Sequence, residues 1–250
     1  MFDTVVSLSP DFVFLCTEHV FYNQETLGWM CRAYNAAGIA PVVRILEPDP
    51  YLATQALDSG ACAVLVPYTE DADLVMELVG AVKYRPLKGK KLKDILNGRT
   101  KPDEELIKYL TGNNINNSLL LNIESPEGVM NIDSFLSVGS PDGPGVDGIV
   151  LGPHDLSVSY GIPEKYESSG FLELTTGIIR KVRAAGISAG GHNGSRGSVS
   201  LQVAWAEAGA NIIMHSSDIF LFADKYAEDM NRIRKITGDK RIISGREDNV

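Results

Sequence analysis

Leu119-Leu-Leu-Asn-Ile-Glu124 is an apolar run that ends in a carboxylate, and Val146-Asp-Gly-Ile-Val-Leu-Gly-Pro-His-Asp155 repeats this pattern further along the chain. Continuous aliphatic runs are typical of parallel strands that helices cover on both faces. An acidic group is tolerated far better at the end of such a strand than inside it. Two neighbouring strands of this kind would bring Glu124 and Asp155 to one rim of a barrel, where two carboxylates can hold a divalent metal ion.

Each of these two acids also has a structural explanation. Carboxylates at strand ends often cap the helix that follows, and Asp155, which precedes Leu156 and Ser157, could serve only as such a cap. Taken alone, either acid favours the structural explanation. Taken together with the rest of the chain, the pair favours a site.

Five further apolar runs have the length of buried strands, at residues 12–16, 41–45, 62–66, 186–189 and 211–214. Helical patterns separate them, and strands that alternate with helices predict a parallel sheet. The resulting seven strands are one short of a closed (β/α)₈ TIM barrel. Either residues 4–8 supply a poor first strand, or one strand is missing at the N-terminus.

A doubly wound open sheet is the alternative to this barrel. It would need a phosphate-binding loop, and the glycine-rich residues 190–194 match neither GxGxxG nor the Walker A spacing. We therefore expect the barrel.

The length and composition indicate one soluble domain. With 250 residues, 44% hydrophobic and 22% charged, the chain suits a single barrel over residues 1–250. Residues 84–117 are expected to form an inserted loop and helix region, and residues 240–250 a frayed polar tail. The net charge of −9 argues against nonspecific binding to nucleic acid or to acidic membranes.

The cysteines and the hydropathy predict a cytoplasmic protein. Cys16, Cys31 and Cys62 form no CxxC pair, and buried free thiols in a reducing cytosol are the simplest account of them. No charged-then-apolar leader and no apolar run of membrane-spanning length is present.

Chemistry in such a barrel collects at the carboxyl ends of the strands. His19 and Arg44 are expected there, together with Glu124 and the pair His154 and Asp155. A lone histidine in the place of His19 is more often a hydrogen-bonded structural residue than a catalyst. Arg44 needs an anionic partner to offset its desolvation, which could be Glu18 or Glu47, or a substrate carboxylate held by two hydrogen bonds.

Other polar residues near strand or helix ends have simpler interpretations. Asp58 by itself is a solvated helix cap, and we interpret His192 and His215 as structural because neither has a neighbouring metal-type ligand in the sequence. The cationic residues 83–101 are either a solvated loop or a mobile cover that attracts anionic substrates, and we favour the loop.

Six short motifs occur in one order along the chain. They are Asp11-Phe-Val-Phe-Leu-Cys-Thr-Glu18-His19, Val42-Val-Arg44, Ala56-Leu-Asp58-Ser-Gly60-Ala, Val64-Leu-Val-Pro67, Asn122-Ile-Glu124 and Gly152-Pro-His-Asp-Leu-Ser157. Together they resemble the HpcH/HpaI group of metal-dependent class II aldolases, which is related to the citrate lyase β-subunit. The resemblance covers nearly the whole chain, from Asp11 to about Lys235.

The resemblance implies a (β/α)₈ barrel of the phosphoenolpyruvate/pyruvate-domain type, commonly a hexamer in which a terminal helix is exchanged between partners. It implies cleavage of a 4-hydroxy-2-oxoacid to pyruvate and an aldehyde, with Mg²⁺, Mn²⁺ or Co²⁺ as the metal ion. By this resemblance, His19 would be the catalytic base, Asp58 would be the partner of His19, and Arg44 would stabilise the enolate. Glu124 and Asp155 would bind the metal ion. Asn122 and the backbone at His154 and Asp155 would contact the oxoacid.

The chemistry of the residues agrees with this reaction. Cleaving the C3–C4 bond of such an oxoacid leaves a pyruvate enolate, which a metal ion and a fixed cation such as Arg44 can stabilise while a nearby base removes the C4 hydroxyl proton.

The chain departs from the family pattern in four places. Cys16 stands where the family usually has aspartate, Asn122 where glutamine is common, and His154 where a small residue is usual, and the family's glycine-arginine-glycine loop is absent from residues 83–101. These departures suggest a different aldehyde partner. Two alternatives also stay open: a lyase for a CoA thioester of the citryl-CoA or malyl-CoA type, and an inactive barrel with a binding or assembly role.

Overall fold

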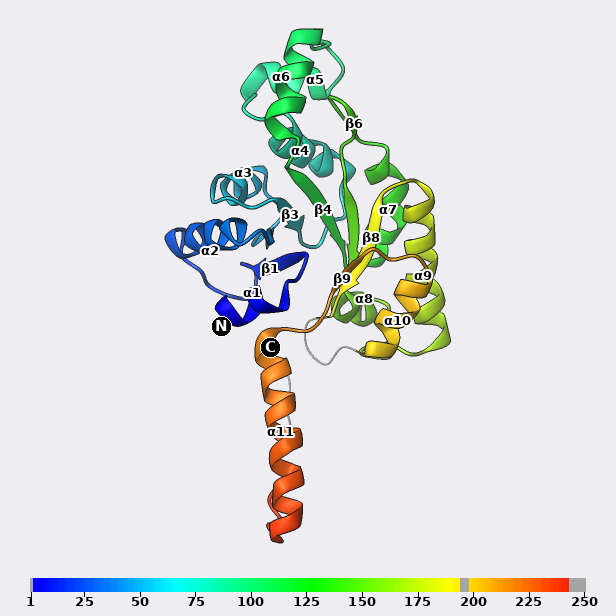
Figure 1. Ribbon diagram of the computed structural model, residues 1–250. Coiled ribbons are helices and arrows are strands. Elements are labelled where there is room, and N and C mark those ends of the chain that lie inside the picture. The colour runs from blue at the N-terminus through cyan, green and yellow to red at the C-terminus, as the bar shows by residue number, and fades with distance from the viewer. Residues whose placement is uncertain (1, 194–197, 243–250) are drawn as a thin grey trace.

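The computed structural model describes residues 2–193 and 198–242, and a seven-stranded parallel sheet organises it (Figure 1). The strands follow the order β1-β2-β3-β4-β7-β8-β9, and every neighbouring pair is parallel. Their bounds are Phe12–Cys16 for β1, Ala40–Arg44 for β2, Ala63–Val66 for β3, Ser118–Ile123 for β4, Gly148–Leu151 for β7, Ser188–His192 for β8 and Ile212–Met214 for β9. All seven predicted strands are present.

Helices connect the strands and cover the outside of the sheet (Figure 1). Several begin at a side chain that satisfies a free backbone N–H group, as Asn23 does for Thr26 and Ser125 for Gly128. The helices are α1 (Phe2–Leu8), α2 (Gln24–Ala36), α3 (Pro50–Asp58), α4 (Ala72–Lys83), α5 (Gly89–Leu96), α6 (Glu104–Asn114), α7 (Pro126–Leu136), α8 (Pro153–Ser159), α9 (Ser169–Ala184), α10 (Val199–Glu207) and α11 (Asp218–Thr237). A small antiparallel hairpin, β5 (Gly139–Ser140) with β6 (Gly143–Pro144), precedes β7.

Residues 4–8 do not form a strand: they belong to helix α1. Residues 4–8 therefore do not supply the eighth strand. Among the described residues β1 pairs only with β2 and β9 only with β8, so the barrel-like sheet is nearly closed but not complete. Val5 and Val6 pack on the core from one side of this helix. A short apolar run of this kind is found both in buried strands and in short helices.

Alternate residues of the strands face the inside of this barrel-like sheet. They pack into a small cluster of their own, made of Val42, Ala63, Leu65, Leu120, Val150 and Met214, against which Phe12, Phe14 and Ile212 also pack. The opposite side chains of the same strands pack under the helices in a much larger core. This two-sided burial explains the continuous apolar runs in the sequence.

Helices α5 and α6 lie within residues 84–117, the predicted inserted region, and this region leads into the start of β4. Figure 1 shows them at the end of the sheet opposite to α8 and α11, which follow the carboxyl ends of β7 and β9. The cationic residues 88–101 thus lie far from the rim where the predicted site residues gather. This placement argues against a cover over the site.

No described helix is both long enough and apolar enough to cross a membrane. Residues 243–250 of the predicted polar tail, and Gly194 of the glycine-rich stretch, lie outside the described residues.

Candidate active site

Glu124 follows the last residue of β4 and is almost fully buried, with 2% of its surface exposed. Its Oε2 accepts a hydrogen bond of 3.0 Å from the backbone N–H of Tyr68. Its Oε1 lies 3.9 Å from Arg44 Nη1 and 3.7 Å from His192 Nε2. Burial alone would raise the pKa of Glu124, but the contacts with His192, the Tyr68 backbone and Arg44 outweigh it and hold the pKa below its usual value.

The backbone of Tyr68 is arranged for this contact. Tyr68 adopts a left-handed φ of 45° just after β3, a conformation that is uncommon for a bulky residue and that often marks functional sites. The donated N–H group fixes one carboxylate oxygen of Glu124 and leaves the other facing Arg44 and His192.

Arg44, the last residue of β2, is buried to 4% exposure, and its partner is Glu18 rather than Glu47. Arg44 Nε lies 3.0 Å from Glu18 Oε2, while Nε and Nη2 donate to the sulfur of Cys16 at 3.3 and 3.1 Å. The guanidinium also lies over the ring of Phe14, 5.6 Å from its centroid. One side of the guanidinium is thus held in place, and Nη1 faces Glu124.

The carboxylates of Glu124 and Asp155 both lie within electrostatic reach of Glu18. Burial is the main cause that raises the pKa of Glu18, Arg44 opposes that rise, and the negative charges of Glu124 and Asp155 add to it. Gly152, three residues before Asp155, lies against the Glu124 carboxylate, because a β-carbon at this position would overlap it. The carboxylate therefore lies directly against the turn that leads to Asp155.

Asp155 is not the cap of helix α8. The cap position belongs to Gly152, and Asp155 lies in the first turn of the helix, where a negative charge is favourable. The purely capping interpretation of Asp155 is therefore wrong.

His19 lies just beyond the end of β1, with an exposed side chain whose Nε2 is 3.9 Å from Glu18 Oε2. Asp58 ends helix α3 and forms an ion pair with Arg85. Because α3 leads into the start of β3, Asp58 belongs to the opposite end of the sheet. Among the described residues, no hydrogen bond or ion pair joins Asp58 to His19.

Asn122 and His154 differ in their surroundings. Asn122 is fully buried, and its Nδ2 lies 3.2 Å from His192 Nε2, while its Oδ1 has no hydrogen-bond partner within residues 2–193 and 198–242. His154 is exposed, with Nδ1 3.4 Å from the Tyr166 hydroxyl and 3.9 Å from Glu164 Oε1.

Two residues of this site were not predicted. Glu18 was considered only as a partner for Arg44, although its place beside His19 at a strand end was a usable signal. His192 was interpreted as structural, because its closeness to Asn122 and Glu124 depends on how β8 pairs with β7, which the sequence does not reveal.

The donor set fits a hard divalent cation, although no group of three or more His, Cys, Asp or Glu side chains in the described part of the chain could hold a metal ion unaided. Mg²⁺ usually takes only one or two protein carboxylates and keeps several water ligands. Glu124 and Asp155 supply two such carboxylates. The buried oxygen Asn122 Oδ1, which has no hydrogen-bond partner among the described residues, is a further hard group in the same region.

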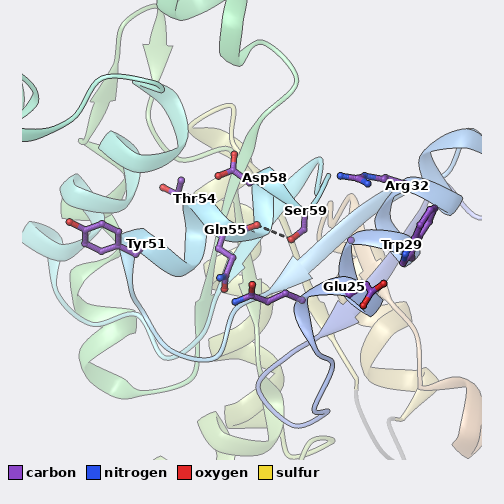
Figure 2. A pocket seen from close by; sticks show the side chains of 10 residues that line it. Glu25, Trp29, Arg32, Tyr51, Thr54, Gln55, Asp58 and Ser59 are labelled. Atoms are coloured by element: carbon purple, nitrogen blue, oxygen red, sulfur yellow. Dashed lines mark hydrogen bonds between the residues drawn. The ribbon is translucent and has the colours of Figure 1, made fainter.

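A cleft of about 520 Å³ lies on the outer surface between α2 and α3 (Figure 2). It contains Asp58 but none of the other predicted site residues. Its lining is made of Gln24, Glu25, Gly28, Trp29, Arg32, Tyr51, Thr54, Gln55, Asp58 and Ser59. The cleft is therefore separate from the carboxylates at the strand ends.

Comparison with known proteins places this arrangement in a family. The HpcH/HpaI aldolase/citrate lyase family matches residues 26–213, a range that contains the predicted site residues except His19. The 2-keto-3-deoxy-L-rhamnonate aldolases of Salmonella gallinarum and Escherichia coli O157:H7 are 28% and 29% identical to this chain over 214 residues, which is 86% of the chain and 77% of each relative.

Solved structures agree with this match. An HpcH/HpaI aldolase from Desulfitobacterium hafniense DCB-2 superposes with a TM-score of 0.78 over 96% of this chain and 90% of that chain; at 23% identity, this similarity concerns the fold alone. The citrate synthase SbnG has a TM-score of 0.75 and 28% identity, with the same coverage. The expected barrel and the expected resemblance are both confirmed: the chain belongs to the HpcH/HpaI aldolase/citrate lyase family, whose enzymes act as carbon–carbon lyases.

Proposed function

We propose that this protein is a metal-dependent carbon–carbon lyase that reversibly cleaves a 4-hydroxy-2-oxoacid to pyruvate and an aldehyde. The observation that carries the proposal is the buried pair Arg44 and Glu124 at the carboxyl ends of two strands, with Nη1 of the arginine 3.9 Å from Oε1 of the glutamate. The names of the curated relatives describe aldolases of a 2-keto acid, which supports an oxoacid as the substrate class.

The chain supplies a fixed cation for the charge that develops during cleavage. When the C3–C4 bond breaks, its electrons pass into the carbonyl group and give the pyruvate enolate. Arg44 uses Nε and Nη2 to contact Glu18 and Cys16, so its Nη1 hydrogens remain free to donate to the enolate oxygen. Such preorganised donors stabilise developing charge strongly, because they need no reorganisation during the reaction.

The chain also supplies a base for the hydroxyl proton. His19 is exposed at the rim and has Glu18 beside it, so we assign to it the removal of the C4 hydroxyl proton. Within one chain Glu18, rather than Asp58, is placed to orient His19 and to stabilise its protonated form.

Glu124 and Asp155 would hold the divalent ion, which we propose to be Mg²⁺, Mn²⁺ or Co²⁺. When bound, the ion supplies a Lewis acid for the oxoacid carboxylate and ketone oxygens. The Tyr68 N–H group holds Oε2 of Glu124, and Gly152 leaves room for Oε1. Asn122 and the backbone at His154 and Asp155 line the same region and would contact the oxoacid.

A coupled assay tests this proposal by measuring pyruvate release from a panel of 4-hydroxy-2-oxoacids. We expect release with added Mg²⁺ or Mn²⁺, its loss with a chelator, and its loss in Glu124→Gln. The matched control is Glu47→Gln, which changes an exposed acid three residues after Arg44 and should retain activity. Release that persists in chelator, or in Glu124→Gln, contradicts the proposal.

The structure weakens the two alternatives. The cationic residues 83–101, which begin at the end of α4 and include α5, lie at the end of the sheet opposite to the site and so are remote from a CoA thioester that reacts there. Cys16, whose presence suggested an inactive barrel, accepts two hydrogen bonds from Arg44 and so takes part in holding the guanidinium. The thiols of Cys16, Cys31 and Cys62 are all free, which supports action in the reducing cytoplasm.

We further propose that the protein is a homo-oligomer, a hexamer by resemblance, in which α11 packs against another copy. In Figure 1 this helix projects away from the sheet, and Ala227 is its only buried residue. Its exposed large apolar side chains are Ile219, Leu221, Phe222, Tyr226, Ile233 and Ile236. Light scattering after size exclusion should give a multiple of the chain mass, which Phe222→Asp should reduce; a monomeric wild type contradicts this proposal.

A further inference from the structure

Large apolar side chains are exposed in the loops that follow β1, β2 and β3. Phe21 is 95% exposed and Leu46 is 52% exposed, and the side chains of Val20 and Tyr68 are exposed as well. Each of these residues lies just beyond the carboxyl end of its strand, which is the end of the sheet where the candidate active site is. Single exposed apolar residues are ordinary, but several of them beside one site indicate a binding surface.

The backbone keeps Phe21 outside the core. The N–H group of Tyr22 donates a hydrogen bond of 3.1 Å to the carbonyl oxygen of Val20, which makes a tight turn with Phe21 at its tip. Tyr22 packs against the core, and Asn23 accepts a hydrogen bond of 2.7 Å from the N–H group of Thr26 and so caps α2. The phenyl ring can therefore enter the core only if these contacts break.

Leu46 lies on the same side of its strand as Arg44. In β2, Val42 packs in the inner cluster and Val43 in the core under the helices. Ile45 continues the ladder through its N–H group and packs under the helices like Val43. Successive side chains of an extended chain point to opposite sides, so Leu46 belongs to the inner side. Its side chain therefore lies beyond the guanidinium, toward the mouth of the barrel-like sheet.

The proposed reaction brings the variable part of the substrate to this side of the mouth. C4 of the oxoacid carries both the hydroxyl group and the substituent that leaves with the aldehyde. Because His19 removes the hydroxyl proton, C4 has to lie next to His19, and Val20 and Phe21 follow His19 directly in the sequence. Further round the sheet, the segment after β7 presents polar groups instead, with His154 Nδ1 3.9 Å from Glu164 Oε1.

We propose that Phe21 and Leu46 are specificity-determining residues, which select a 4-hydroxy-2-oxoacid with an apolar substituent at C4. The inference rests on the proposed aldolase function and deepens it, because it names the class of aldehyde that is released: an alkyl or aryl aldehyde rather than a hydroxylated or charged one. Contact with these side chains removes the apolar substituent from water, and full burial of one CH₂ group corresponds to about a fourfold gain.

Pyruvate release from a homologous series measures this preference. The series consists of 4-hydroxy-2-oxoacids with a methyl, ethyl, propyl or butyl group at C4. The polar comparison is 4,5-dihydroxy-2-oxopentanoate, whose hydroxymethyl group is similar in size to ethyl. With added Mg²⁺ we expect kcat/KM to rise about two- to fourfold for each added CH₂ group, and to be roughly tenfold lower for hydroxymethyl than for ethyl.

The ratio of kcat/KM for the butyl substrate to that for the methyl substrate isolates the contact, because both substrates undergo the same chemistry. Phe21→Ser and Leu46→Ser should each lower this ratio about threefold or more, and Phe21→Leu, which keeps an apolar side chain, should recover most of it. The matched control is Tyr109→Ser, which should keep the ratio. Tyr109 is also large and exposed, but it belongs to α6 at the opposite end of the sheet (Figure 1).

A second copy of the chain is the competing occupant of this surface, so light scattering is recorded for every variant. A ratio that falls only in variants whose oligomer mass also falls would assign these side chains to the contact between copies and overturn the inference. An unchanged ratio in both serine variants, or an equal loss in Tyr109→Ser, would overturn it too. A wild type that releases no pyruvate from any of these substrates contradicts the proposed function as well, whereas a flat series, or a preference for hydroxymethyl, in an active enzyme overturns this inference alone.

Discussion

The buried Arg44 and the partly exposed Glu18 form an ion pair, with Nε of the arginine 3.0 Å from Oε2 of the glutamate. The pair forms across two adjacent strands, because Cys16 at the end of β1 is in register with Arg44 at the end of β2. A buried guanidinium without a partner would be costly. Glu18 and the Cys16 sulfur therefore hold the guanidinium and leave Nη1 directed at Glu124.

Arg44→Lys should lower kcat by about a hundredfold or more, since one oxyanion-type contact is worth ~3 kcal/mol. A single ammonium group cannot replace the Nε and Nη2 contacts and also donate to the enolate oxygen. Steady-state kinetics with saturating metal measures the loss. Arg85→Lys, which alters the surface pair with Asp58, is the control and should stay near wild type. An Arg44→Lys enzyme within threefold of wild type would contradict the assigned role.

Glu18→Gln should change how stability depends on pH. Burial raises the pKa of Glu18 above its ordinary value, so the folded state binds this proton more tightly than the unfolded state does. The stability that the protonated form contributes is present below the unfolded pKa and is lost as pH rises through the folded pKa. The unfolding free energy of the variant relative to wild type should therefore increase as the pH is raised from about 4.5 upward.

Urea denaturation at several pH values between about 4 and 8 measures this difference. Glu47→Gln serves as the control, because Glu47 is exposed, and its curve should run parallel to that of wild type. A difference between Glu18→Gln and wild type that stays flat, or that shrinks as the pH rises, would show that burial does not dominate at Glu18.

The strands were predictable because their physical cause is local. Residues 12–16 form β1 with the predicted bounds, since its side chains pack on the inner cluster and on the core under the helices, which favours apolar residues on both faces. Residues 4–8 were ambiguous for the same reason: a short apolar run packs equally well as one side of a helix, and α1 is that helix.

The details of the site depend on long-range register and were less predictable. Nothing local distinguishes Glu18 from Glu47 as the partner of Arg44; the pairing of β1 with β2 decides it. His192 needs the pairing of β7 with β8 to reach Asn122. The sequence could indicate which residues end strands, but not which neighbours they meet.

Cys31 should be the least reactive thiol of the folded protein. Its side chain is fully buried, and burial raises its pKa from 9.0 to about 11, so near pH 8 little of it is thiolate, the form that reacts. Cys16 is partly exposed and forms hydrogen bonds to Arg44. Mass spectrometry after timed iodoacetamide treatment should find Cys16 alkylated well before Cys31, and the difference should vanish in urea. Equal rates in the folded protein would contradict the burial of Cys31.

Gly152→Ala should weaken metal binding and cleavage while the fold persists. A β-carbon at this position would overlap the carboxylate of Glu124. The carboxylate would have to move away from the Tyr68 N–H group that fixes it. Losing the support of a metal-binding side chain typically costs about 10- to 100-fold in metal affinity, and we expect a loss in that range by calorimetric titration with Mn²⁺, with a matching loss of pyruvate release.

Gly177→Ala separates this local effect from the general effect of replacing a glycine. Gly177 lies on the exposed side of α9, and a β-carbon there meets no atom within 4 Å. Alanine at this place should raise the unfolding free energy by about 1 kcal/mol through helix propensity and leave metal affinity as it is. If Gly152→Ala binds Mn²⁺ as tightly as Gly177→Ala does, the Glu124 carboxylate either tolerates displacement or does not hold the ion, and the assignment of the metal site to this end of β4 fails.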